Sequence, residues 1–82
     1  MKFQLFSLVV LANDLPNTIF KRGDLATVVE FVEGLNGSPD GYILEIFDWQ
    51  GNTLDVVPVL ETDIYQPKKT AVLTYRELEL VA

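Results

Sequence analysis

One short stretch constrains the fold of this chain most. Residues 21–24 combine two basic side chains with a glycine and an aspartate, which is a composition typical of a turn. Residues 25–33 follow at once and are rich in valine and threonine, whose branched side chains pack well on a pleated surface. The chain is therefore expected to turn before Leu25 and to enter a β-strand there.

The composition narrows the class of protein. The chain has 82 residues, 49% of them hydrophobic, and no cysteine or histidine. A chain of this length is typical of one domain, so we expect a single domain over residues 1–82. The missing cysteines exclude disulfides and thiolate metal sites, and the missing histidines remove the commonest general base. We therefore expect a protein that is not an enzyme, with no catalytic residue, no metal and no cofactor.

The charge distribution argues against nucleic acid as a partner. The net charge is −6, and no Lys or Arg lies between Arg22 and Lys68, whereas nine Asp and Glu residues lie there. Binding to nucleic acid depends on neutralising phosphates with clustered Lys and Arg. An acidic chain of this kind is better suited to a basic protein surface.

The first residues form an apolar run that needs interpretation. Residues 3–11 are interrupted by Gln4 and Ser7, and no small-x-small cleavage site follows them. We interpret the run as a first β-strand rather than a signal peptide. No stretch approaches the roughly 18 apolar residues of a membrane span. We therefore expect no membrane association and a cytoplasmic location.

The clearest hairpin joins residues 42–48 to residues 53–60. The sequence between them matches a type I turn in which Gly51 adopts the left-handed conformation. Such a turn pairs Asp48 with Asn52 and thereby sets the register of both strands. In that register the core side consists of Tyr42, Leu44, Ile46, Leu54, Val56 and Pro58, and the other side carries Ile43, Glu45, Phe47, Thr53, Asp55 and Val57.

The rest of the chain supplies connections and a tail. A long loop precedes Gly23, with Ile19 and Phe20 as its expected inward anchors, and residues 61–67 form a polar link compatible with one 3₁₀ turn. Residues 68–82 form a C-terminal tail. Its alternation over 70–81 predicts an extra strand, and a short helix over 75–80 is the alternative.

The turn residues 21–24 with the strand 27–30, together with Leu15-Pro16, Tyr42, residues 45–48 and residues 51–53, resemble the small bacterial and cyanobacterial family known as domain of unknown function 4926. The likeness covers roughly residues 1–60 and rests on structural turns. It departs at Ala26, where the family usually has glycine, and in the longer tail. The resemblance implies an all-β, small SH3-like barrel of about five antiparallel strands, with a C-terminal strand or short helix, and no assigned reaction.

Two candidate sites lie on the outer side of the hairpin. Five apolar residues form an expected interaction face, namely Ile43, Phe47, Trp49, Val57 and Val59. Trp49 is either exposed for a partner or folded onto a neighbouring strand. Glu45 and Asp55 are expected to face each other across the strands, where paired carboxylates can exchange a proton or hold a hard cation. The simpler interpretation is two solvated acids.

These observations favour a non-enzymatic, cytoplasmic module that binds protein. The partner is either a second copy, in a homo-oligomer, or another protein with a basic surface. One alternative is an antitoxin-like or immunity-like inhibitor that covers a basic partner. The alternative from a different class is a metal-dependent enzyme that uses Glu45 and Asp55.

Overall fold

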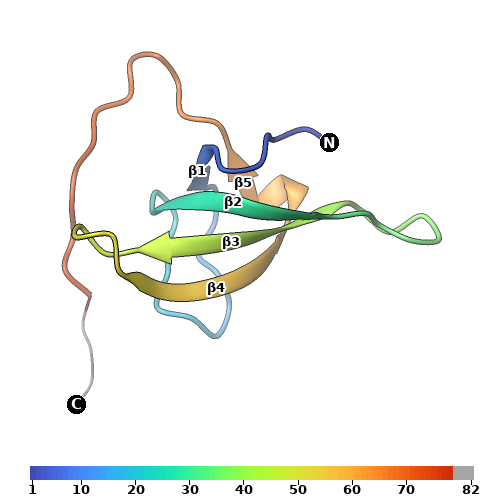
Figure 1. Cartoon of the computed structure of the whole chain (residues 1–82), viewed down its shortest axis with the longest axis horizontal. Coiled ribbons are helices and arrows are strands. Elements are labelled where there is room, and N and C mark those ends of the chain that lie inside the picture. The colour runs from blue at the N-terminus through green and yellow to red at the C-terminus, as the bar shows by residue number, and fades with distance from the viewer. Residues whose placement is uncertain (79–82) are drawn as a thin grey trace.

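Five antiparallel strands form one sheet in the order β4-β3-β2-β1-β5 in the computed structural model, which describes residues 1–78 (Figure 1). The strands are β1 (Leu8–Leu11), β2 (Leu25–Val32), β3 (Gly41–Phe47), β4 (Thr53–Leu60) and β5 (Ile64–Tyr65), with a 3₁₀ turn at Glu61–Asp63. The predicted all-β class and the number of strands are confirmed. Within residues 1–78 the sheet is open, with β4 and β5 at its edges, and does not close into a barrel.

The turn before β2 forms as its residues predict. Gly23 has a φ of 93°, in the left-handed region that glycine adopts readily. Its N–H donates to the carbonyl of Leu11 at 2.8 Å, and the N–H of Leu11 donates to the carbonyl of Asp24 at 2.9 Å. The turn thus brings the start of β2 beside the end of β1, and β2 begins at Leu25 as expected.

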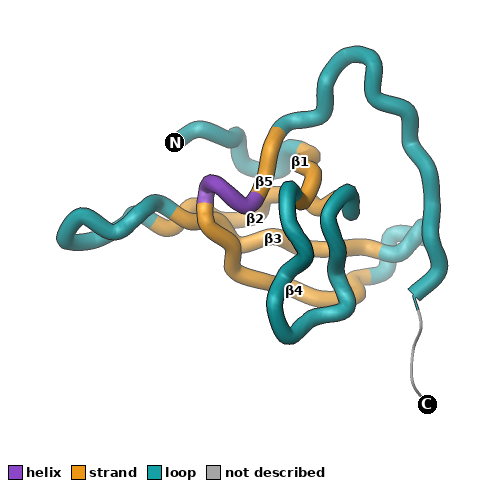
Figure 2. Tube along the Cα trace, turned by 180° about the vertical axis from the view of Figure 1, so that it is seen from behind, coloured by secondary structure: helices purple, strands orange, loops and turns teal. Residues whose placement is uncertain are grey.

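The core lies between the sheet and the long loop of residues 12–24, which crosses in front of β3 and β4 in the view of Figure 2. The largest side chains with essentially no exposed surface are Tyr42, Leu11, Leu44, Val9 and Val28. The loop contributes Leu15 and Phe20, which are both buried. The prediction of Phe20 as an inward anchor is confirmed, whereas Ile19 is exposed.

Tyr42 ties the N-terminal segment to the sheet. Its ring packs edge-on against Phe3 and at a tilt against Phe31, each at 5.4 Å between ring centroids. Its phenolic oxygen accepts hydrogen bonds from the backbone N–H groups of Lys2 (2.8 Å) and Phe3 (3.0 Å). A buried hydroxyl therefore has its hydrogen-bond partners, as buried polar groups generally require.

The first strand is shorter than predicted, because the chain turns at residues 4–7. Both the hydroxyl and the N–H of Ser7 donate to the carbonyl of Gln4, at 2.6 and 3.3 Å. Phe6 adopts a φ of 65° and its side chain is exposed. This local side-chain-to-backbone bonding competes with the ladder of the sheet. The predicted strand over residues 3–11 is therefore wrong for residues 3–7.

The predicted tail strand or helix is wrong for the described part of the tail. Residues 66–78 form neither, and they arch away from the sheet in Figure 1. Pro67, which lies two residues after the end of β5, lacks an N–H. The N–H of Ala71 donates to the carbonyl of Lys68 at 2.9 Å in a local turn. The fifth strand is instead β5, which pairs with Val10 and Leu11. Residues 79–81 of the predicted strand lie outside the described residues.

Candidate interaction face

The hairpin turn has the predicted conformation. Gly51 has a φ of 89°, and the N–H of Asp48 donates to the carbonyl of Asn52 at 2.9 Å. The carboxylate of Asp48 accepts the backbone N–H groups of Asn52 and Gln50, each at 2.9 Å. The bond from Asn52 is the main cause that holds the pKa of Asp48 below its ordinary value. The first pair after the turn, Phe47 with Thr53, follows the predicted register.

The register changes one residue later, at a β-bulge. Leu54 has no partner on β3, and the next pairs are Ile46 with Asp55 and Leu44 with Val57. One extra residue on β4 moves every later side chain of that strand to the opposite face. Val57 and Val59 are consequently core residues, only 6% and 7% exposed. Their predicted place on the interaction face is wrong.

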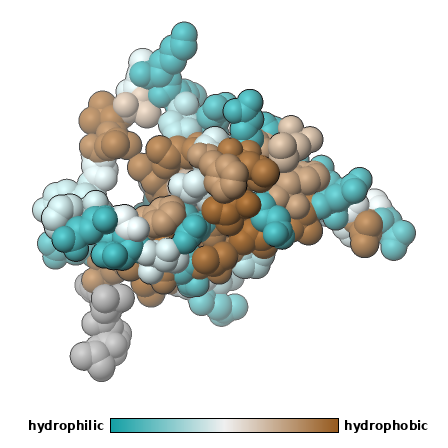
Figure 3. Space-filling model, in the orientation of Figure 1, coloured by the Kyte–Doolittle hydropathy of each residue, from teal (hydrophilic) through white to brown (hydrophobic). Residues whose placement is uncertain are grey.

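The outer face of the hairpin consists of other β4 residues. Ile43 and Phe47 lie on it as predicted, and β4 contributes Val56 and Pro58 in place of the two core valines. Phe47 is 40% and Val56 51% exposed. We call Ile43, Phe47, Val56 and Pro58 the outer face. Figure 3, which views the side of the sheet away from the loop of residues 12–24, shows hydrophobic residues gathered over its middle.

The acidic pair predicted from the sequence does not form. Glu45 lies opposite Val56, whereas Asp55 lies opposite the buried Ile46 and therefore on the other face of β4. The Glu45 carboxylate accepts the hydroxyl of Thr53 at 2.5 Å. Within residues 1–78 no three acidic side chains gather where they could hold a metal ion. This geometry gives the metal-dependent alternative no support.

The outer face is acidic as well as apolar. On β2, Glu30 pairs with Ile43 and Thr27 pairs with Glu45, so two carboxylates lie among the apolar residues of this side. The strands β2, β3 and β4 contain no Lys or Arg. Trp49, at the tip of the turn, is almost fully exposed, so its ring is not folded onto a neighbouring strand. This side of the sheet therefore combines apolar side chains with negative charge.

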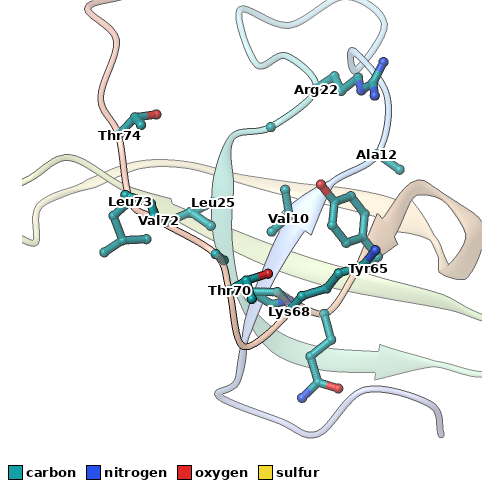
Figure 4. A pocket seen from close by; sticks show the side chains of 14 residues that line it. Val10, Ala12, Arg22, Leu25, Tyr65, Lys68, Thr70, Val72, Leu73 and Thr74 are labelled. Atoms are coloured by element: carbon teal, nitrogen blue, oxygen red, sulfur yellow. The ribbon is translucent and has the colours of Figure 1, made fainter.

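A second feature, which the sequence did not reveal, is an ion pair that holds the tail. The guanidinium of Arg76 donates from Nε and Nη2 to the two carboxylate oxygens of Asp24, at 2.8 and 2.5 Å, and from Nη2 to the carbonyl of Ile19 at 3.0 Å. We call residues 66–78 the strap. Together with the sheet it lines an open groove of about 830 Å³. Figure 4 shows the strap residues Val72 and Leu73 on one side of this groove and Val10, Leu25 and Tyr65 on the other.

The ion pair is expected to open in acid. Burial raises the pKa of Asp24, but the hydrogen bonds from Arg76 and from the N–H of Lys21, with the charges of both residues, outweigh it and bring the pKa below the ordinary 3.8. Because the pKa of Asp24 is lower in the folded protein, the ionised carboxylate stabilises the closed strap above pH 3.8. This stabilisation is lost as the pH falls through the pKa that Asp24 has in the folded protein.

In an NMR titration, the Arg76 Nε–H signal should therefore keep its ion-paired position near neutral pH and move to that of a free arginine below pH 3.8. In Asp24→Asn the signal should have the free position at every pH. A signal that is equal in both proteins, or that moves with a midpoint above pH 3.8, would contradict the ion pair.

No family model, no curated protein and no solved structure matches the chain. The resemblance to domain of unknown function 4926 stays a prediction from the sequence. Within residues 1–78 no helix has both the length and the apolar character that crossing a membrane requires.

Proposed function

We propose that this chain is a non-enzymatic, cytoplasmic protein-interaction module that binds a basic and partly apolar protein surface through its outer face. The observation that carries the proposal is the exposure of Phe47 and Val56 on a side of the sheet that also holds Glu30 and Glu45. Burying apolar side chains against a partner is favourable, and the carboxylates select a partner of opposite charge.

Pro58 favours contact through the face rather than through the edge of the sheet. β4 is an edge strand within residues 1–78, and an exposed edge normally invites pairing with a strand of another chain. A proline in an edge strand has its missing N–H on the solvent side, so Pro58 interrupts the row of donors that such pairing needs. Pro58 therefore favours side-chain contact with the outer face over strand pairing along β4.

The test places a charge in the centre of the outer face. Val56→Lys should fold, because Val56 is half exposed, but should no longer bind, because a lysine in an apolar contact is costly to desolvate. Leu35→Lys is the matched control, since Leu35 is exposed in the loop between β2 and β3. Circular dichroism checks the fold of all three proteins, and sedimentation together with capture of proteins from a lysate measures binding.

Wild type and Leu35→Lys should either self-associate to the same extent or retain the same proteins from the lysate. Val56→Lys should do neither. Equal behaviour of all three proteins in both assays would overturn the proposal. Retention of duplex DNA or RNA by the wild type, with an affinity that falls steeply as salt rises, would also count against it.

A further inference from the structure

The strap has the chemistry that a partner of the outer face requires. It carries Lys68, Lys69 and Arg76, which are three of the six Lys and Arg residues of the chain. Three of its large apolar side chains are exposed, at 83% for Val72, 73% for Leu73 and 87% for Tyr75. The chain thus contains both an acidic, apolar sheet face and a basic, apolar segment.

Within its own molecule the strap is held at its ends and packs little in between. Arg76 anchors one end to Asp24 and Ile19, and β5 with Pro67 anchors the other. The open groove of about 830 Å³ beneath the strap shows that its apolar side chains do not close onto the sheet. Phe47 and Val56 stay exposed, so the strap does not cover the outer face of its own molecule either.

We propose that the strap of one molecule docks on the outer face of a second copy, and that two molecules pair reciprocally in this way. The proposal rests on the outer face of the proposed function and names its partner. Val72, Leu73 and Tyr75 contact the apolar residues of the partner, and Lys68 and Lys69 lie toward its carboxylates, Glu30 and Glu45. The Arg76–Asp24 ion pair holds the strap in place before docking, which lowers the entropy lost on association.

Two single variants test this pairing. Val56→Lys damages the face and leaves the strap intact, whereas Leu73→Glu damages the strap and leaves the face intact. Each is expected to raise the dissociation constant of the dimer, measured by sedimentation equilibrium, at least about tenfold, because each places a charge in an apolar contact. Leu35→Glu is the control for the second variant and should pair like the wild type. Circular dichroism should show wild-type folding for all of them.

Mixing the two variants provides the decisive measurement. The strap of Val56→Lys can dock on the intact face of Leu73→Glu, so an equimolar mixture should have a lower dissociation constant than either variant alone. Raising the salt concentration should weaken both the mixed and the wild-type dimers.

Three outcomes overturn the pairing of strap and face. They are a wild type that stays monomeric, a Leu73→Glu variant that pairs as the wild type does, and a mixture that associates no more tightly than either variant alone. In each of these cases the proposed function still stands if Val56→Lys, but not Leu35→Lys, loses the proteins that the wild type retains from a lysate. It fails separately if Val56→Lys retains them.

Discussion

Val57→Lys is expected to abolish the fold, whereas Val56→Lys, one residue earlier, leaves it intact. Val57 is a core residue opposite Leu44, and an unpaired charge there costs several kcal/mol, roughly 3 to 5. The whole domain is stable by only about 4 to 12 kcal/mol, at the usual 0.05–0.15 kcal/mol per residue. Val56 lies on the outer face, where a lysine remains in water.

Urea unfolding followed by circular dichroism distinguishes these outcomes. Val56→Lys should show a cooperative transition close to that of the wild type, and Val57→Lys should show none or a much lower midpoint. A hairpin without the bulge at Leu54 would give the reverse pair of results. The two variants therefore test the register of β4 directly.

Tyr42→Ala is expected to lower the free energy of unfolding by about 3 to 5 kcal/mol, the cost of deleting a large buried aromatic ring. Tyr42 has no exposed surface and packs against both Phe3 and Phe31. Tyr42→Phe is the matched control that keeps the ring. It should cost about 1 to 3 kcal/mol, because the N–H groups of Lys2 and Phe3 lose their acceptor.

Both changes in the free energy of unfolding are measured from urea midpoints. The slope of the free energy against urea concentration should be the same as in the wild type. An unchanged midpoint for Tyr42→Phe would mean that the hydroxyl does not hold the N-terminal segment. If Tyr42→Ala were as stable as the wild type, the placement of this ring at the centre of the core would be wrong.

The elements that the sequence predicts correctly depend on local signals. Gly23 marks the turn into β2 and Gly51 the turn of the hairpin, and both adopt the positive φ for which glycine is suited. The sequence also predicts the correct face for each side chain of β3, because successive side chains of a regular strand point to opposite faces of the sheet.

The errors on β4 have a single physical cause. Leu54 is an ordinary strand residue, so no local signal marks the bulge at which it loses its partner. The bulge at Leu54 alone places Val56 on the outer side and Val57 in the core, the reverse of the prediction. It also places Glu45 and Asp55 on opposite faces of the sheet. The sequence therefore predicts the side on which the residues lie correctly for β3 and wrongly for β4.

The tail shows a different limit. An alternating pattern becomes a strand only where it pairs with a sheet edge. The place beside β1 is taken by β5, and residues 66–78 pair with neither β4 nor β5. Arg76 and Asp24 are separated by 52 positions in the sequence. Local sequence patterns do not indicate contacts between residues so far apart in the chain.

That separation has a consequence for the order of events when the chain folds. The entropy of closing so long a loop opposes the Arg76–Asp24 contact in an unfolded chain. Asp24 takes up its position only when the end of β1 has met the start of β2, through the hydrogen bonds that join Leu11 to Gly23 and Asp24. We therefore expect the strap to close only after β1 and β2 have paired, so that its closure reports on an event late in folding.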